Sequence, residues 1–146
     1  MTIGKTIDKI SLGDTAEFVK TVSETDVYLY AGVTGDFNPA HMNEVYARET
    51  FFKTRIAHGM LTAGFISSIL GTQLPGPGTI YMEQSLKFIA PVHFGDTITA
   101  RAEVVEMITE KNRIRLKTIC TNQDGRMVLD GEAWVSPPKA PKARSF

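Results

Sequence analysis

The 146-residue sequence predicts a single α+β domain, in which a long antiparallel sheet accompanies one buried helix. Two patterns support this prediction. Apolar residues recur every three to four positions within residues 59–73, and at every second position in several segments between residues 80 and 135. A chain of this length buries enough surface for one core without metal or disulfide support. Cys120 is the only cysteine, which excludes an internal disulfide and a cysteine-rich zinc site.

The N-terminal part is predicted to hold a strand followed by helices. Residues 15–22 alternate between apolar and polar side chains, which indicates a strand. Ser23 fits a helix N-cap with Asp26 at the third helical position, and this helix is expected to end near Gly35. An Asn-Pro pair at residues 38–39 favours a second, short helix, because asparagine caps helices and proline suits their first turn.

Residues 59–73 form the strongest predicted helix. One side carries apolar residues at three- and four-residue spacing: Leu61, Phe65, Ile66 and Ile69. Another side carries small residues: Ala63, Gly64, Ser67, Ser68 and Gly71. Because small residues allow a backbone to approach closely, we expect this second side to pack against the face of a sheet. The helix is therefore predicted to be buried.

After the helix-breaking Pro-Gly-Pro-Gly sequence at residues 75–78, the apolar period changes to two. The alternating segments lie at about residues 80–88, 98–104, 113–120 and 127–135. The first segment is expected to share one face among its apolar residues: Ile80, Met82, Leu86 and Phe88. Strands joined by short turns predict an antiparallel meander with one solvent-exposed face. Such a sheet wrapped around a long central helix is the layout of a hot-dog fold.

The expected domain spans residues 1–136. Residues 137–146 contain three prolines and three basic residues without an acid, which is typical of a mobile tail. Sixteen basic residues balance sixteen acidic ones, so no net charge favours nucleic acid or an anionic membrane. The most apolar stretch, about 12 residues, is too short to span a bilayer. We expect a cytoplasmic protein whose near-zero net charge favours self-association.

Asp36 and His41 are the first candidates for acid–base chemistry. Residues five apart would not meet on a regular helix, but a bend at Asn38 can bring them together. A carboxylate and a neutral imidazole that share one water make a general acid–base pair. The same composition also fits an ordinary turn with a surface histidine, so both interpretations are open.

Gly59 is the second candidate, because it begins the predicted helix and its N–H has no partner within that helix. Such an N–H suits a thioester carbonyl whose oxygen gains negative charge during a reaction. Gly59 could equally be only a flexible start to the helix. His58 is expected to pack or to orient its loop, and His93 to be structural. The histidines lack metal-ligand spacing and the glycines lack nucleotide-binding patterns, so no metal or other cofactor is predicted.

Three segments resemble the MaoC-like (R)-specific enoyl-CoA hydratases in the family's order: residues 35–41 (GDFNPAH), 56–61 (IAHGML) and 88–96 (FIAPVHFGD). The similarity covers residues 10–136. The resemblance implies a hot-dog homodimer that acts without a cofactor. It also implies a reaction, the reversible syn addition of water to trans-2-enoyl-CoA, which gives (R)-3-hydroxyacyl-CoA.

The resemblance also implies roles for single residues. Asp36 and His41 match the catalytic pair that holds the water, and Gly59 matches the residue whose N–H binds the thioester oxygen. Asn38 matches a supporting position, and Ser67 falls where the family has a small polar residue near the active site. Residues that are candidates for lining the acyl tunnel are Leu61, Phe65, Ile80 and Met82.

Three other functions stay open for the sequence. A hot-dog acyl-CoA thioesterase would hydrolyse the thioester and would not need a double bond. A 3-hydroxyacyl dehydratase acting on acyl carrier protein would run the same chemistry on another carrier. A non-catalytic module would bind acyl-CoA without turnover. Which of Asp36 and His41 takes the first proton is also open, because such a pair titrates as a coupled unit.

Overall fold

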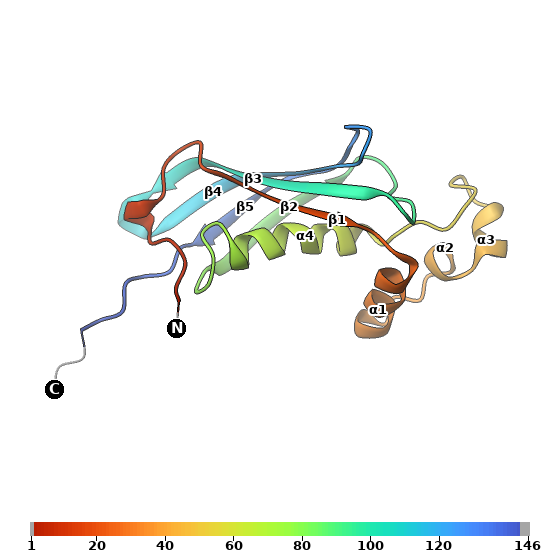
Figure 1. Ribbon diagram of the computed structural model, residues 1–146, viewed down its shortest axis with the longest axis horizontal. Coiled ribbons are helices and arrows are strands. Elements are labelled where there is room, and N and C mark those ends of the chain that lie inside the picture. Colours follow the sequence, from red (N-terminus) through yellow and green to blue (C-terminus); the bar gives the residue numbers. More distant parts are fainter. Residues whose placement is uncertain (1, 144–146) are drawn as a thin grey trace.

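Figure 1 shows one antiparallel sheet lying over the long helix α4, with helices α1 to α3 grouped beyond one end of the sheet. The computed structural model describes residues 2–143. Its elements in chain order are η1 (Ile7–Lys9), β1 (Thr15–Thr21), α1 (Glu24–Thr34), α2 (Pro39–Met42), α3 (Glu44–Arg48), α4 (Gly59–Thr72), β2 (Ile80–Phe88), β3 (Thr97–Ile108), η2 (Thr109–Lys111), β4 (Arg113–Thr121) and β5 (Met127–Ser136).

Helix α1 begins and ends where the sequence predicts, and α2 begins at the predicted Asn38 cap, whereas α3 is not predicted. The Ser23 hydroxyl accepts the Asp26 N–H at 3.1 Å, and the Asp26 carboxylate accepts the Ser23 N–H at 2.9 Å, which completes a capping box before α1. Gly35 ends α1 in a left-handed conformation with φ of 79°, where a Cβ would be unfavourable. The Asn38 side chain caps α2 by accepting a backbone N–H at 3.0 Å. The chain therefore turns sharply between α1 and α2.

The sheet has five strands within the described residues, in the order β1-β3-β4-β5-β2, and all neighbouring pairs are antiparallel. The predicted meander is correct for β3, β4 and β5. It is wrong for β2, which pairs with β5 and not with β3, the next strand in the chain. The connection from β2 to β3 therefore crosses the sheet, and β1 and β2 form its two edges.

Strand β2 also contains an irregularity that the alternating pattern does not reveal. Its pairing with β5 shifts between Tyr81 and Glu83. Beyond this bulge, Leu86 and Phe88 pair with the same face of β5 as Tyr81 does. The prediction that Ile80 shares a face with Leu86 and Phe88 is therefore wrong, because one extra residue moves the later side chains to the opposite face.

The core lies between the inner face of the sheet and one side of α4. The apolar residues of this side are buried: Leu61, Phe65, Ile66 and Ile69. The small-residue side points the other way, since Gly64, Ser67 and Gly71 are exposed, and a Cβ at either glycine would meet no described atom within 4 Å. The prediction that the small residues pack on the sheet is therefore wrong for Gly64, Ser67 and Gly71, whereas Ala63 of the same set is buried. Burying the larger apolar side chains removes more apolar surface from water, so this side of α4 faces the sheet.

The C-terminal segment leaves β5 in close contact with the sheet. Pro137 and Pro138 are buried, and the Asn112 side-chain amide donates to the Pro137 carbonyl at 2.8 Å. Residues 139–143 are exposed, and residues 144–146 of the predicted tail lie outside the described residues. We therefore propose that the domain extends to Pro138. Among the described residues, none of the helices has the length and apolar character that crossing a bilayer requires.

Candidate active site

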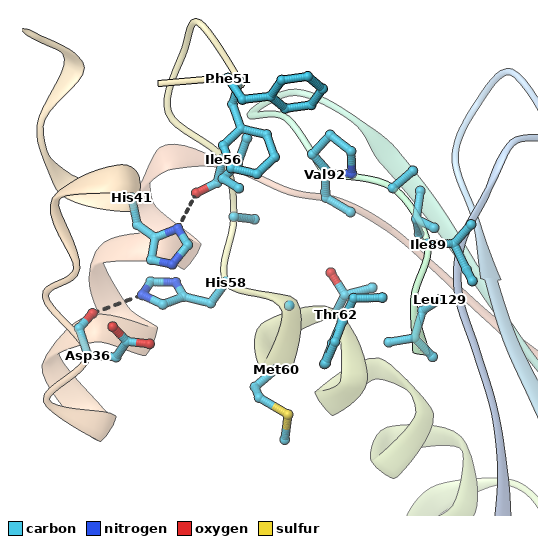
Figure 2. Close-up of a pocket in the computed structure, with 17 residues that line it drawn as sticks. Asp36, His41, Phe51, Ile56, His58, Met60, Thr62, Ile89, Val92 and Leu129 are labelled. Atoms are coloured by element: carbon cyan, nitrogen blue, oxygen red, sulfur yellow. Dashed lines mark hydrogen bonds between the residues drawn. The ribbon is translucent and has the colours of Figure 1, made fainter. Parts of the chain in front are cut away.

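The three residues predicted to be catalytic line one cavity of about 500 Å³ at the N-terminal end of α4 (Figure 2). Asp36 lies in the loop between α1 and α2, His41 lies in α2, and Gly59 is the first residue of α4. The remaining wall is mainly apolar and comes from the loop before α4, the segment after β2, and β5. The fold therefore brings together three residues that are up to 23 positions apart in the sequence.

His41 is buried, and its hydrogen bond fixes which ring nitrogen carries the proton. Nδ1 lies 2.7 Å from the Ile56 carbonyl oxygen, which only accepts, so Nδ1 donates and Nε2 of the neutral ring keeps a lone pair. Burial lowers the pKa of His41, and the neighbouring His58 lowers it further, while the Ile56 contact and the Asp36 carboxylate act in the opposite direction. The neutral ring is therefore favoured near neutral pH.

Asn38 connects Asp36 to the helix that carries His41. Its backbone N–H donates to the Asp36 carboxylate at 3.2 Å, and its side chain caps α2. Asp36 itself is exposed and lines the cavity. One residue thus fixes both the direction of the Asp36 side chain and the start of the His41 helix, which fits the supporting position that the sequence predicts for Asn38.

His58 is the site residue that the sequence reasoning underestimated. It is 2% exposed, its Nε2 lies 2.9 Å from the Asp36 backbone carbonyl, and its ring lies against that of His41 with centroids 3.9 Å apart. It orients the Asp36 loop, as expected, but it also lines the cavity. Asp36 and His58 are 22 positions apart, so local spacing does not reveal their contact. The available signal was the position of His58 directly before Gly59.

Gly59 combines a helix N-terminus with a tight neighbour. As the first residue of α4, it directs its N–H away from the helix, and the preceding His58 side chain does not cap this end. A Cβ at Gly59 would lie 2.6 Å from the Phe88 ring, so a larger residue would have to displace that side chain. The absence of a side chain at Gly59 therefore allows the Phe88 ring of β2 to approach the start of α4.

The other predicted site residues lie elsewhere. Ser67 lines a second cavity of about 380 Å³ between α4 and β2, together with Met82. Ser67 is about 12 Å along the helix axis from Gly59, at 1.5 Å per residue. Leu61 and Phe65 are buried in the core, and Ile80 is exposed on the edge strand β2. The structure therefore groups the acid–base residues but does not place the four predicted tunnel residues around them.

A five-stranded antiparallel sheet packed on a long helix is a hot-dog domain, and this one holds a carboxylate and an imidazole beside the N-terminus of its central helix. The family model described as MaoC like domain matches residues 10–124. The chain therefore belongs to the MaoC-like domain family, as the resemblance in the sequence implies.

Individual relatives agree with this assignment. The chain is 56% identical over 131 residues to the (R)-specific enoyl-CoA hydratase of Rhodospirillum rubrum, with 90% of each chain covered. It is 48% identical to the 3-hydroxybutyryl-CoA dehydratase of Methylorubrum extorquens, over 93% of this chain and 86% of that protein. The solved structure of unliganded R-hydratase PhaJ1 from Pseudomonas aeruginosa superposes with a TM-score of 0.89 and 41% identity, covering 98% of this chain and 94% of that one.

Proposed function

We propose that the protein is an (R)-specific enoyl-CoA hydratase, which reversibly adds water to trans-2-enoyl-CoA in syn fashion and gives (R)-3-hydroxyacyl-CoA. The observation that carries the proposal is the convergence of Asp36, His41 and Gly59 on one cavity. The relatives support the substrate class, because their names describe hydration and dehydration of CoA thioesters. We place the activity in the cytoplasm, where the sequence analysis predicts the protein to be.

In the proposed mechanism, the Gly59 N–H donates a hydrogen bond to the thioester carbonyl oxygen. This contact draws electron density from C3 of the enoyl group and stabilises the charge that develops on the oxygen. A helix N-terminus adds to this effect, because its partial positive charge favours an anion there. Loss of one such donor typically costs about 10²–10³ in rate.

The acid–base pair then accepts a proton from water and donates a proton to the substrate, both from one side of the substrate. Water between the Asp36 carboxylate and His41 Nε2 gives one proton to the pair as its oxygen bonds to C3. The resulting enolate takes a proton from the pair at C2, so the sum of the steps is one water added. Because both transfers use groups on the same wall, the addition is syn. The Ile56 carbonyl holds the proton on His41 Nδ1, which leaves Nε2 free to accept.

The apolar wall of the same cavity suits the acyl chain. Phe52, Val92 and Leu129 line it, and their side chains exclude water from the reacting atoms. We place the start of the acyl chain along this wall, since the predicted tunnel residues Leu61 and Phe65 are buried in the core. Preference for acyl length then depends on how far this wall continues.

We also propose that the protein is a homodimer that forms along β2. This edge strand has unpaired backbone groups and exposed apolar side chains, including Ile80 at 64% and Met82 at 40% exposure. The exposed small-residue side of α4 lies across the second cavity from β2. A second copy of the chain would cover both surfaces and would bring Ser67 into an interface.

The hydratase proposal is tested with crotonyl-CoA and the purified full-length chain. We expect the absorbance of the enoyl thioester to fall without release of free thiol, and the product to be (R)-3-hydroxybutyryl-CoA. Persistence of the absorbance with release of thiol would identify a thioesterase instead. A much higher kcat/KM with the enoyl group on acyl carrier protein would assign the chain to the dehydratases of that carrier. Binding without any turnover would identify a binding module.

A further inference from the structure

We propose that Asp36, His41 and His58 bind one divalent transition cation of the Zn²⁺ class. Each residue offers one ligand atom, and these atoms lie within 4.8 Å of one another. Imidazole nitrogens and carboxylate oxygens are common Zn²⁺ ligands, and three of them leave a fourth position for water. The three residues come from a loop, from α2 and from the residue before α4, so their spacing in the sequence does not indicate a metal site.

The two histidines are held in the form that binds a metal. His41 donates from Nδ1 to the Ile56 carbonyl at 2.7 Å, and His58 donates from Nε2 to the Asp36 carbonyl at 2.9 Å. Each ring therefore keeps a lone pair on its other nitrogen. Metal-binding histidines almost always donate their second N–H to a carbonyl or carboxylate, which fixes the ring and makes the free nitrogen a better ligand.

His58 Nδ1 gives an independent indication that a ligand belongs here. This nitrogen is buried, the residue is 2% exposed, and Nδ1 has no hydrogen-bond partner within residues 2–143. Buried polar atoms are normally paired, and each exception calls for a reason. A cation bound at Nδ1 uses its lone pair, and Figure 2 shows the three side chains gathered on the same side of the cavity.

Binding requires the site to rearrange, because the ligand atoms are only within 4.8 Å of one another and the adjacent rings of His41 and His58, with centroids 3.9 Å apart, must turn for both nitrogens to reach one ion. Tetrahedral Zn²⁺ with bonds of about 2.0–2.2 Å places its ligand atoms about 3.4 Å apart. The exposed Asp36 side chain is free to turn toward the two rings, and each ring can pivot about its single hydrogen bond to a backbone carbonyl. The bound cation would occupy the carboxylate and the Nε2 atom on which the proposed hydration depends. Zn²⁺ is therefore an inhibitor of that reaction, and a chelator should reverse the inhibition.

The test is a titration of the full-length protein with Co²⁺ in the absence of substrate, followed by visible absorption. We expect one Co²⁺ per chain with the bands of a four-coordinate ion, and displacement of the Co²⁺ by Zn²⁺. His58→Gln and Asp36→Asn should each weaken Co²⁺ binding at least tenfold, because loss of a supporting contact alone costs about 10–100-fold. His93→Gln is the matched control, since His93 lies outside the cavity with a side chain that is 44% exposed.

Absence of the four-coordinate bands at millimolar Co²⁺ would overturn the proposal, and so would unchanged binding by either site variant. Loss of binding in His93→Gln would also overturn it by placing the metal elsewhere. If circular dichroism shows that His58→Gln does not fold, Asp36→Asn decides the question, because its side chain is exposed. The inhibition by Zn²⁺ rests on the hydratase proposal, but the binding of the cation does not. Co²⁺ binding is measured without substrate, so a protein inactive on crotonyl-CoA would still test it.

Discussion

The two cavities beside α4 differ in how much of each is built by one chain. The cavity at the N-terminal end contains buried histidines whose rings are fixed by carbonyl oxygens of the same chain. The second cavity lies between the exposed side of α4 and the edge strand β2, and its residues Met82 and Ser67 are open to solvent. The residues of the first cavity are held by contacts within one chain, whereas in the proposed dimer the second cavity would be covered by another copy along β2.

The largest expected effect comes from removing the carboxylate at the first cavity. Asp36→Asn should lower kcat for crotonyl-CoA hydration by about 10²–10⁴, because the amide cannot accept the proton from water. The measurement is the steady-state rate together with sedimentation of the variant. Asp124→Asn, the same change in an exposed turn, is the control and should be unaffected. A dimer that dissociates in Asp36→Asn would contradict the separation of the two cavities.

A somewhat smaller effect is expected at the helix terminus. Gly59→Ala should lower kcat/KM by about 10²–10³, comparable to loss of an oxyanion donor, because the new Cβ lies 2.6 Å from the Phe88 ring and must displace it. Gly32→Ala is the matched control in α1, where a Cβ meets no described atom within 4 Å. That substitution should raise the free energy of unfolding by about 0.5–1 kcal/mol through helix propensity. Equal activity of both variants would exclude a role for the start of α4.

The second cavity is tested through its edge strand. Met82→Lys should weaken self-association by about tenfold or more, since a charge on an edge strand opposes pairing with another chain. Analytical ultracentrifugation measures the effect, and Val33→Lys, at an 86% exposed position of α1, is the control. Activity per folded chain should fall less than in Asp36→Asn. A Met82→Lys protein that stays as associated as the parent would place the interface elsewhere.

The smallest effect is expected inside the first cavity, at Thr62. Its hydroxyl is buried without a hydrogen-bond partner in the described part of the chain. Thr62→Val should therefore raise the free energy of unfolding by up to about 1 kcal/mol, because it removes an unsatisfied polar group at nearly constant shape. Urea unfolding monitored by fluorescence measures the change. A loss of more than 1 kcal/mol would mean that the hydroxyl has a partner in solution.

Sequence reasoning succeeded where local interactions decide the structure. The caps at Ser23 and Asn38 depend on residues two or three positions away, so the starts of α1 and α2 can be predicted from the sequence. The bulge in β2 and the pairing of β2 with β5 depend on contacts between distant segments. The alternation of apolar and polar residues along one strand does not show which strand it pairs with.

The grouping of the candidate residues in one cavity was predictable to a similar extent, and their catalytic roles stay a prediction. Asp36, His41 and Gly59 lie in short motifs, and the turn between α1 and α2 explains how the first two meet. The position of His58 in the cavity depends on a hydrogen bond to a backbone carbonyl 22 residues away, which local spacing does not reveal. Ser67 lies on the side of α4 that faces away from the sheet. Helical periodicity separates the sides of a helix, but it does not say which side the sheet will cover.

The hydrogen bond between His58 and the Asp36 carbonyl joins the helical group to the start of α4, and the bond between His41 and Ile56 forms a second link. The proposed acid–base pair therefore lies at the contact between two parts of the domain, the group of helices α1 to α3 and the sheet with α4. Loosening of the helical group would move Asp36 and His41 away from Gly59 while the strands stay paired. Increasing urea should thus abolish turnover before the fluorescence of Trp134 in β5 reports melting of the sheet.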